Sequence, residues 1–317
     1  MTSVIQTEGL RKSFGQQVVL DGIDLDIAGG GVFALLGPNG AGKTTFVQIL
    51  STLMRPDAGT ARVEGHDVVR EPAAVRAAIG VTGQFSAVDD LLTGEENLRL
   101  MADLRHLGRA GKARVAALLE RFDLSEAARK PLAQFSGGMR RRLDLAMTLV
   151  SRPRLVFLDE PTTGLDPRSR VGMWEIVREL VTEGTTVLLT TQYLEEADEL
   201  ADRIAVLDRG TIVADGSPTE LKRLVPGGRI RLEFEHLREL DAASAAFADA
   251  QRDDAALALD IPSDGGFGSI RTVVDRLDGQ GVEARTLSIH TPDLDDVFFA
   301  LTGHEASIPT ATEEVAS

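Results

Sequence analysis

Apolar residues in the first two thirds of the chain form two kinds of pattern: short continuous runs and stretches with helical spacing. A continuous run ends at 35–36, and two others occupy 155–158 and 186–189. Runs of this length are typical of strands covered on both faces of an α/β sheet. After the first run, apolar residues recur over 44–53 as on one face of a helix, and a turn follows at 56–59. The pattern predicts strands that alternate with helices.

Two more stretches with helical spacing, 95–107 and 112–122, lie between the first and second of these strand runs. They predict a helical insertion of about 85–150 within a larger unit that spans 4–225.

A break at Pro226, Gly227 and Gly228 predicts a linker. The residues after it predict a small C-terminal α+β domain at 229–303, and polar residues 304–317 predict a flexible tail. The expected strands are 230–235, 256–261 and 282–289, and the expected helices are 237–248, 269–277 and 294–301.

Composition limits the class of protein. The chain has 317 residues, of which 43% are hydrophobic, so a sizeable core can form. There is no cysteine, which excludes disulfides and thiolate metal sites. The first ten residues lack the features of a secretory signal, and no apolar run approaches the ~20 residues that cross a bilayer. We therefore expect a soluble or peripheral protein.

The net charge is -15, and it is concentrated in the last part of the chain. Residues 229–317 contain more than twice as many acidic as basic residues. Such a segment repels a phosphate backbone, so nucleic acid is not an expected partner.

A glycine-rich segment between the first predicted strand and helix fits the P-loop pattern. Its backbone N–H groups and the positive end of the following helix can surround a polyphosphate. Lys43 can reach the β- and γ-phosphates, and Thr44 can bind Mg²⁺. The alternative is a turn that binds nothing. The predicted nucleotide-binding residues of this segment are Gly37, Pro38, Asn39, Gly40, Ala41, Gly42, Lys43, Thr44 and Thr45.

Two adjacent acids, Asp159 and Glu160, follow the strand run at 155–158. They are expected at the carboxyl end of a sheet, where α/β proteins bind ligands. Successive strand residues point to opposite faces, so the two acids should have different roles. We expect Asp159 to hold Mg²⁺ and Glu160 to orient the attacking water. The alternative is a solvated strand end.

A second glycine motif, Ser136, Gly137 and Gly138, precedes a predicted helix. The serine can cap that helix, and the free N–H groups form another possible anion site. Taken alone, the motif is better explained as a plain helix cap.

Together these motifs resemble the ATP-binding cassette (ABC) family over about 4–225. Residues 135–139 resemble its signature, usually Leu-Ser-Gly-Gly-Gln, with both ends altered. The resemblance implies that Gln84 contacts Mg²⁺ and faces a membrane partner. It also implies that 163–166 form the D-loop, with Asp166 near the nucleotide, and that Phe14 stacks on adenine. The alternative for Phe14 is a core residue.

Gln192 stands where family members usually have a histidine. Its amide can still donate a hydrogen bond to the γ-phosphate, but it cannot ionise. A γ-phosphate sensor is therefore expected here, and acid–base chemistry is not. The altered signature, the segment around Gln192 and the acidic C-terminal unit resemble the daunorubicin-resistance type of export ATPase.

The resemblance implies a P-loop NTPase core, with ATP and Mg²⁺ as cofactors and a catalytic set of Lys43, Glu160 and Gln192. In the family each ATP lies between one P-loop and the signature of a second cassette. We therefore expect a dimer of this chain on the cytoplasmic face of the cell membrane, bound peripherally to a multi-spanning permease. The expected function is drug export. The alternatives are lipid or polysaccharide export, a non-transport ABC ATPase and a non-hydrolysing regulatory ATP binder.

Overall fold

The computed structural model describes residues 3–83, 88–225, 228–263 and 266–303. These residues divide into two compact units, one up to Pro218 and one from Thr219 onward. The division falls earlier than the predicted end of the first domain at 225. Most of the predicted linker, the tail at 304–317 and Gln84 lie outside the described residues.

The first unit is built on a six-stranded sheet with the order β10-β9-β3-β8-β7-β6. Its inner strands are parallel, and only β10 runs antiparallel to its neighbour. The strands are β3 Val32–Leu36, β6 Ile79–Thr82, β7 Leu155–Asp159, β8 Thr186–Thr191, β9 Arg203–Asp208 and β10 Thr211–Gly216. The three predicted strand runs are β3, β7 and β8, and every residue of each is buried. The α/β fold class is confirmed.

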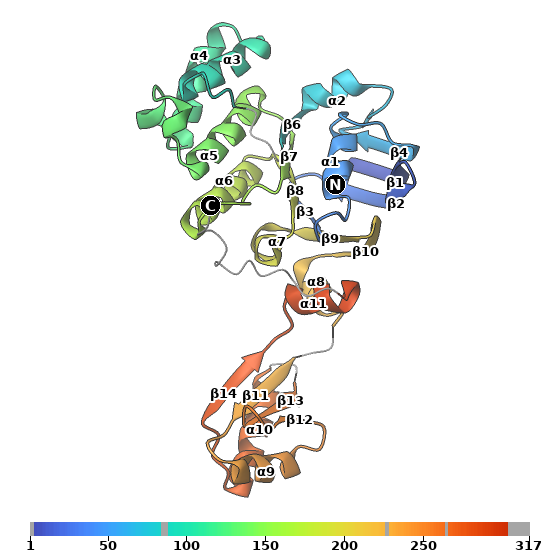
Figure 1. The fold of residues 1–317 in the computed structure, drawn as a ribbon, viewed down its shortest axis with the longest axis vertical. Helices are drawn as coiled ribbons and strands as arrows, with labels where there is room; N and C mark the ends of the chain where they lie inside the picture. Colours follow the sequence, from blue (N-terminus) through green and yellow to red (C-terminus); the bar gives the residue numbers. More distant parts are fainter. Residues whose placement is uncertain (1–2, 84–87, 226–227, 264–265, 304–317) are drawn as a thin grey trace. The chain divides into compact units, whose positions relative to one another are not determined.

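A four-stranded antiparallel sheet, β2-β1-β4-β5, packs beside it, and we did not predict this sheet. Its strands are β1 Ser3–Phe14, β2 Gln17–Ala28, β4 Ala58–Val63 and β5 His66–Asp67. Apolar residues of both sheets and of α1 (Lys43–Leu50) form one core, with Leu20, Phe46 and Phe157 fully buried. Figure 1 shows α1 and the antiparallel sheet on one side of the six-stranded sheet.

Helices cover the opposite side of the six-stranded sheet (Figure 1). The predicted insertion is helical, and it contains α3 Gly94–Leu104, α4 Arg109–Arg121 and α5 Gly137–Thr148. Short 3₁₀ turns lie at Ser125–Ala127, Leu132–Gln134 and Leu149–Ser151. The remaining helices of this unit are α2 Pro72–Ala78, α6 Pro167–Thr182 and α7 Leu194–Leu200. At the division between the units lies α8 Pro218–Lys222.

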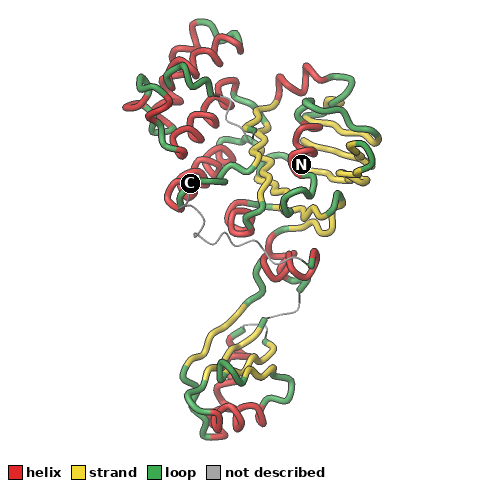
Figure 2. Tube along the Cα trace, in the orientation of Figure 1, coloured by secondary structure: helices red, strands yellow, loops and turns green. Residues whose placement is uncertain are grey.

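The second unit contains the sheet β12-β13-β11-β14, in which all pairs are antiparallel. Figure 2 shows its strands in yellow and its helices in red. Its elements are β11 Arg229–Glu233, α9 Leu237–Ala246, β12 Gln251–Asp253, β13 Ala258–Pro262, α10 Phe267–Gln280, β14 Thr286–His290 and α11 Leu294–Thr302. A separate core joins β11 and β13 to α9 and α10. The predicted strand and helix order is present, with β12 added.

Candidate functional site

The glycine-rich segment connects β3 to α1 in a tightly packed turn. Gly42 has a φ of 112°, which favours glycine, and a Cβ there would lie 2.8 Å from the carbonyl oxygen of Val19. A Cβ on Gly37 would lie 2.3 Å from the carbonyl oxygen of Leu207. These contacts leave no room for a side chain at either position. Only glycine therefore allows the backbone to make this turn between the strand and the helix.

Lys43 begins α1, and its side chain is only 4% exposed. Its Nζ donates to the carbonyl oxygens of Gly37 (2.7 Å) and Pro38 (3.2 Å), so the ammonium lies across the turn. Glu160 Oε1 lies 3.6 Å away. Burial lowers the pKa of Lys43, and the charges of Glu160 and Asp159 oppose that effect. A buried cation on a glycine-rich turn attracts a polyanion strongly.

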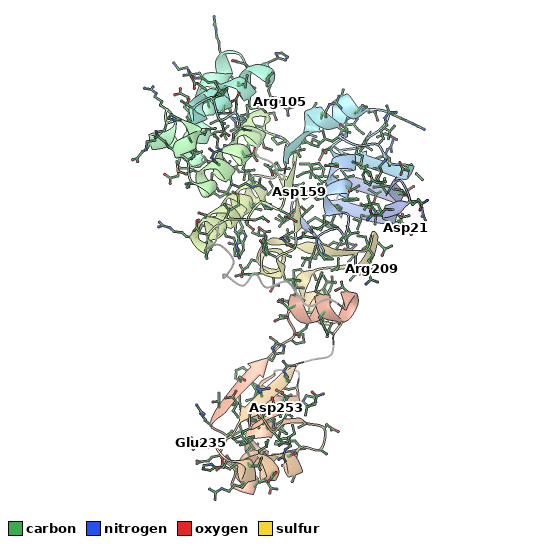
Figure 3. All side chains as sticks on the ribbon, in the orientation of Figure 1. Asp21, Arg105, Asp159, Arg209, Glu235 and Asp253 are labelled. Carbon is green, nitrogen blue, oxygen red and sulfur yellow. The ribbon has the colours of Figure 1, made fainter. Side chains whose placement is uncertain are left out.

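Asp159 ends β7 and is buried. Figure 3 labels it within the first unit. Its Oδ1 accepts a hydrogen bond from the hydroxyl of Thr190 and lies 3.5 Å from Thr44 Oγ1. A carboxylate and a hydroxyl oxygen are ligands suited to Mg²⁺, which usually takes few protein ligands and completes its shell with phosphate and water. No cluster of three or more acidic or histidine side chains that could hold a metal occurs among the described residues. The residues present therefore fit Mg²⁺ bound together with a phosphate ligand.

Glu160 lies just beyond β7, in a left-handed conformation with a φ of 47°. Its N–H donates to the carbonyl oxygen of Thr190 at 3.0 Å, and its Oε2 accepts from Thr163 Oγ1 at 3.3 Å. We expected Asp159 and Glu160 to point to opposite faces because both would belong to the strand. That explanation was wrong, because β7 ends at Asp159. The turn after the strand, instead of the pleat, directs Glu160 toward Lys43 while Asp159 stays in the sheet.

The second glycine motif forms the start of α5. Ser136 is the N-cap and accepts a hydrogen bond from the N–H of Met139 at 3.2 Å. A Cβ on Gly138 would lie 2.8 Å from Ser169 Oγ, so α5 and α6 begin close together. Gly137 has open space around its Cα. The helix-cap role is thus present, and the anion-binding role stays a prediction.

Asp166 caps α6, and its carboxylate accepts from the N–H of Ser169 at 3.0 Å and from its hydroxyl at 2.6 Å. These hydrogen bonds lower the pKa of Asp166. Contact of Asp166 with a nucleotide stays a prediction.

Phe14 ends β1 and is 49% exposed, so the alternative role as a core residue is wrong. Lys12 Nζ lies 5.6 Å from the centre of its ring. Gln192 follows β8 directly and is half-buried. The two residues are thus accessible in the way that their predicted roles require.

Sequence reasoning missed Arg141, on α5. Its guanidinium donates to the carbonyl oxygens of Asp159 (2.9 Å) and Glu160 (3.1 Å), so it holds the turn that carries both acids. The only signal in the sequence is a run of three arginines after the glycine motif, which does not show which of them turns inward.

Glu196 of α7 is a fully buried carboxyl group beside this region. Trp174 Nε1 donates to its Oε1 at 3.3 Å. Burial raises the pKa of Glu196, and the hydrogen bond from Trp174 and the charge of Arg170 oppose the rise. Trp174 itself is buried in the core.

The raised pKa gives a prediction for Glu196→Gln. Because the pKa of Glu196 is higher in the folded than in the unfolded chain, its contribution to folding stability is fully present below a pH of about 4.5. That contribution is lost as the pH rises through the pKa of the folded state. Glutamine stays neutral, so the variant should resist urea better than the wild type at mildly alkaline pH. The difference should narrow as the pH falls toward 4.5. Fluorescence of Trp174, the only tryptophan, reports the unfolding.

Glu195→Gln is the matched control, because Glu195 is the exposed neighbour of Glu196 on the same helix. It should shift the urea midpoint little at any pH. Parallel pH profiles for the wild type and Glu196→Gln would show that Glu196 titrates normally.

Comparison with known proteins agrees with this geometry. Residues 20–163 match the family model described as ABC transporter. A daunorubicin resistance ATP-binding protein of Streptomyces coeruleorubidus is 50% identical over 312 residues, which cover 98% of this chain and 99% of that protein. A daunorubicin/doxorubicin resistance ATP-binding protein of Streptomyces peucetius is 48% identical, with 99% and 97% covered.

Among solved structures, an ATP-binding subunit of an ABC transporter has a TM-score of 0.64 and 29% identity, covering 70% of this chain and 93% of that one. No helix in the described parts of the chain is both long and apolar enough to cross a membrane. The P-loop, the acid pair and the near full-length similarity to these relatives lead to one conclusion: the chain belongs to the ATP-binding cassette family of transport ATPases.

Proposed function

We propose that this chain hydrolyses ATP at sites shared with a second copy of itself and thereby powers the export of drug-like compounds through a separate membrane-embedded permease. The observation that supports hydrolysis best is the meeting of Lys43, Asp159 and Glu160 at one end of the sheet. The relatives named for daunorubicin resistance support drugs as the cargo.

In this proposal the glycine-rich turn and Lys43 hold the triphosphate, and Thr44 and Asp159 hold Mg²⁺ with it. When bound, Mg²⁺ would offset the negative charge of the phosphates. Glu160 orients the attacking water and accepts a proton from it. The water oxygen bonds to the γ-phosphorus while the bond from the γ-phosphorus to the β–γ bridging oxygen breaks, and ADP leaves. Gln192 donates a hydrogen bond to the γ-phosphate, and Gln84 faces the permease.

The proposal includes a second copy because each chain carries one P-loop and one Ser136 motif, and these begin different helices. The P-loop precedes α1 and Ser136 precedes α5, and these helices lie on opposite sides of the six-stranded sheet (Figure 1). In the proposed dimer, Ser136, Gly137 and Gly138 of each copy close over the ATP held by the other. Such a dimer would act on the cytoplasmic face of the membrane, where it would bind the permease peripherally.

Phe14 provides a test of how the nucleotide is oriented. If its exposed ring stacks on adenine, Phe14→Ala should raise the ATP dissociation constant roughly 5- to 150-fold, because stacking of a base on an aromatic ring contributes about 1–3 kcal/mol. Phe14→Trp should preserve affinity. Binding of inorganic tripolyphosphate, measured by calorimetry, should not change in either variant. An unchanged ATP affinity in Phe14→Ala would remove Phe14 from the site.

Transport itself tests the cargo. Cells that express this chain with its permease should release a preloaded anthracycline faster than cells with Glu160→Gln in its place. Release of labelled lipid or polysaccharide in place of the anthracycline would support the alternative cargo classes and contradict drug export.

A further inference from the structure

Arg141 of α5 contacts the backbone of two strand ends. Its side chain is 14% exposed, and within the described residues its four hydrogen bonds all go to backbone carbonyl oxygens. Nη2 donates to Asp159 (2.9 Å) and Glu160 (3.1 Å), Nε to Pro161 (2.9 Å) and Nη1 to Gly83 (3.0 Å). One guanidinium therefore connects α5 to the ends of both β7 and β6.

Only arginine can make this set of bonds. A guanidinium has five N–H donors in a fixed plane, and four of them are used on the carbonyl groups. The Oδ2 of buried Asp144 lies 3.5 Å from Nη1 and balances the charge. A lysine ammonium at the same place has three donors on one nitrogen, so it cannot reach carbonyl groups on both sides.

Arg141 binds the backbone of Glu160, which has a strained conformation. Glu160 has a φ of 47°, a left-handed conformation that is unfavourable for a residue with a side chain. On one side its N–H donates to Thr190, and on the other its carbonyl oxygen accepts from Arg141. This conformation brings the carboxylate to 3.6 Å from Lys43 Nζ.

We propose that Arg141 is a positioning residue for ATP hydrolysis: it holds Glu160 in its left-handed turn and links that turn to the helix that begins with Ser136. The proposal rests on the proposed role of Glu160 in hydrolysis. It assigns Arg141 no contact with ATP. Loss of the guanidinium should therefore impair the chemical step and leave nucleotide binding by Lys43 and the glycine-rich turn intact.

The two neighbouring arginines provide matched controls, because their contacts lie elsewhere. Arg140 contacts Asp90 (2.6 Å) and the carbonyl oxygen of Leu132 (2.9 Å). Arg142 contacts the carbonyl oxygen of Phe122 (2.9 Å). Among the described residues, neither arginine forms a hydrogen bond or an ion pair with the turn that carries the acids. The same substitution at Arg142 thus removes an arginine from the same helix without touching Glu160.

The first measurement compares kcat and the ATP dissociation constant in Arg141→Ala, Arg141→Lys and Arg142→Ala. We expect kcat of Arg141→Ala to fall about 100-fold, the size of effect that misplacement of a catalytic group by about 1 Å can produce. Its ATP affinity should stay within about twofold of wild type. Arg141→Lys should give an intermediate kcat, and Arg142→Ala should hydrolyse ATP at nearly the wild-type rate. If Arg141→Ala does not fold, Arg141→Lys carries the comparison.

The second measurement separates positioning from general loss of structure. Arg141→Ala or Arg141→Lys is combined with Glu160→Gln, and residual hydrolysis is followed in single-turnover reactions. If Arg141 acts through Glu160, the second substitution should add little to the loss caused by Glu160→Gln alone. If the Arg141 substitution instead caused a general structural defect, it would lower the rate of Glu160→Gln by the same factor by which it lowers the rate of the wild type.

The proposal is overturned by equal kcat values in Arg141→Ala and Arg142→Ala, or by independent losses in the double variant. Either result can occur while wild-type protein hydrolyses ATP and Glu160→Gln does not, in which case the proposed function stands. Wild-type protein that binds ATP without hydrolysing it would instead refute the proposed function itself.

Discussion

Lys43→Ala should abolish ATP hydrolysis and weaken ATP binding more than any other single change in this chain. Lys43 is the buried cation of the glycine-rich turn, and two carbonyl oxygens fix its Nζ there. Truncating one partner of a buried, hydrogen-bonded charge pair costs about 2–5 kcal/mol, so the ATP dissociation constant should rise about 30-fold or more. Calorimetry with magnesium and ATP measures this loss, and Lys112→Ala, an exposed lysine of α4, is the control.

The response of stability to ATP makes this prediction specific to function. Burial disfavours the charged ammonium, whereas its hydrogen bonds and the nearby acids favour it, so the effect of ATP on the thermal midpoint reports the role of Lys43 better than the midpoint of the nucleotide-free protein. The rise in midpoint that ATP causes in the wild type should disappear in the variant. A variant whose thermal midpoint still rises with ATP as in the wild type would contradict the assigned role.

Glu160→Gln should separate ATP binding from hydrolysis. Glutamine keeps the shape of the side chain but cannot accept a proton, so hydrolysis should fall about 10²- to 10⁴-fold. The P-loop and Lys43 are unchanged, and the loss of a negative charge 3.6 Å from Lys43 Nζ should not weaken ATP binding. The variant should therefore accumulate as an ATP-bound pair of chains, which sedimentation in the presence of magnesium and ATP would detect.

Glu195→Gln, at an exposed position on α7, should hydrolyse ATP normally and form no lasting pair. If Glu160→Gln keeps the wild-type rate, another group activates the water. If it binds ATP and stays monomeric, ATP does not hold two chains together.

The sequence alone predicted the parts of the site that are local in the chain. The glycine-rich turn, Lys43 and Thr44 are neighbours, and their role follows from a strand, a turn and a helix in direct succession. The acid pair was predicted because it ends a continuous apolar strand. The geometry of Glu160 could not be predicted in the same way, because a φ of 47° depends on Thr190 and Arg141 from other elements.

Contacts between distant segments account for the other omissions. Arg141 is one of three consecutive arginines, and only the packing of α5 against β6 decides which of them reaches the acid pair. The antiparallel sheet was missed because β1 pairs with both β2 and β4, with several shifts in register. Glu196 could not be distinguished from the other acidic residues in the sequence, because its burial beside Trp174 depends on the fold.

Errors in element ends have local causes. The predicted helix at 44–53 ends at Leu50, because Ser51 forms the C-cap and Thr52 adopts a φ of 66°. The strand predicted at 282–289 begins only at Thr286. Gly281 ends the preceding helix in a left-handed conformation, and Val282 then packs into the core of the second unit instead of joining the sheet.

Complementation between two inactive variants tests most directly whether ATP sites are shared between copies. Lys43→Ala destroys the P-loop of its own chain, and Ser136→Arg blocks the motif that closes over the ATP of the other chain. In a mixed dimer, one ATP site combines both defects and the other has neither. Random pairing of equal amounts makes about half of the dimers mixed, and each of these has one intact site of two. Mixing the two inactive proteins should therefore restore up to roughly a quarter of wild-type hydrolysis. A mixture that stays inactive while both proteins remain folded and able to pair, or a fully active Ser136→Arg protein, would contradict the shared site.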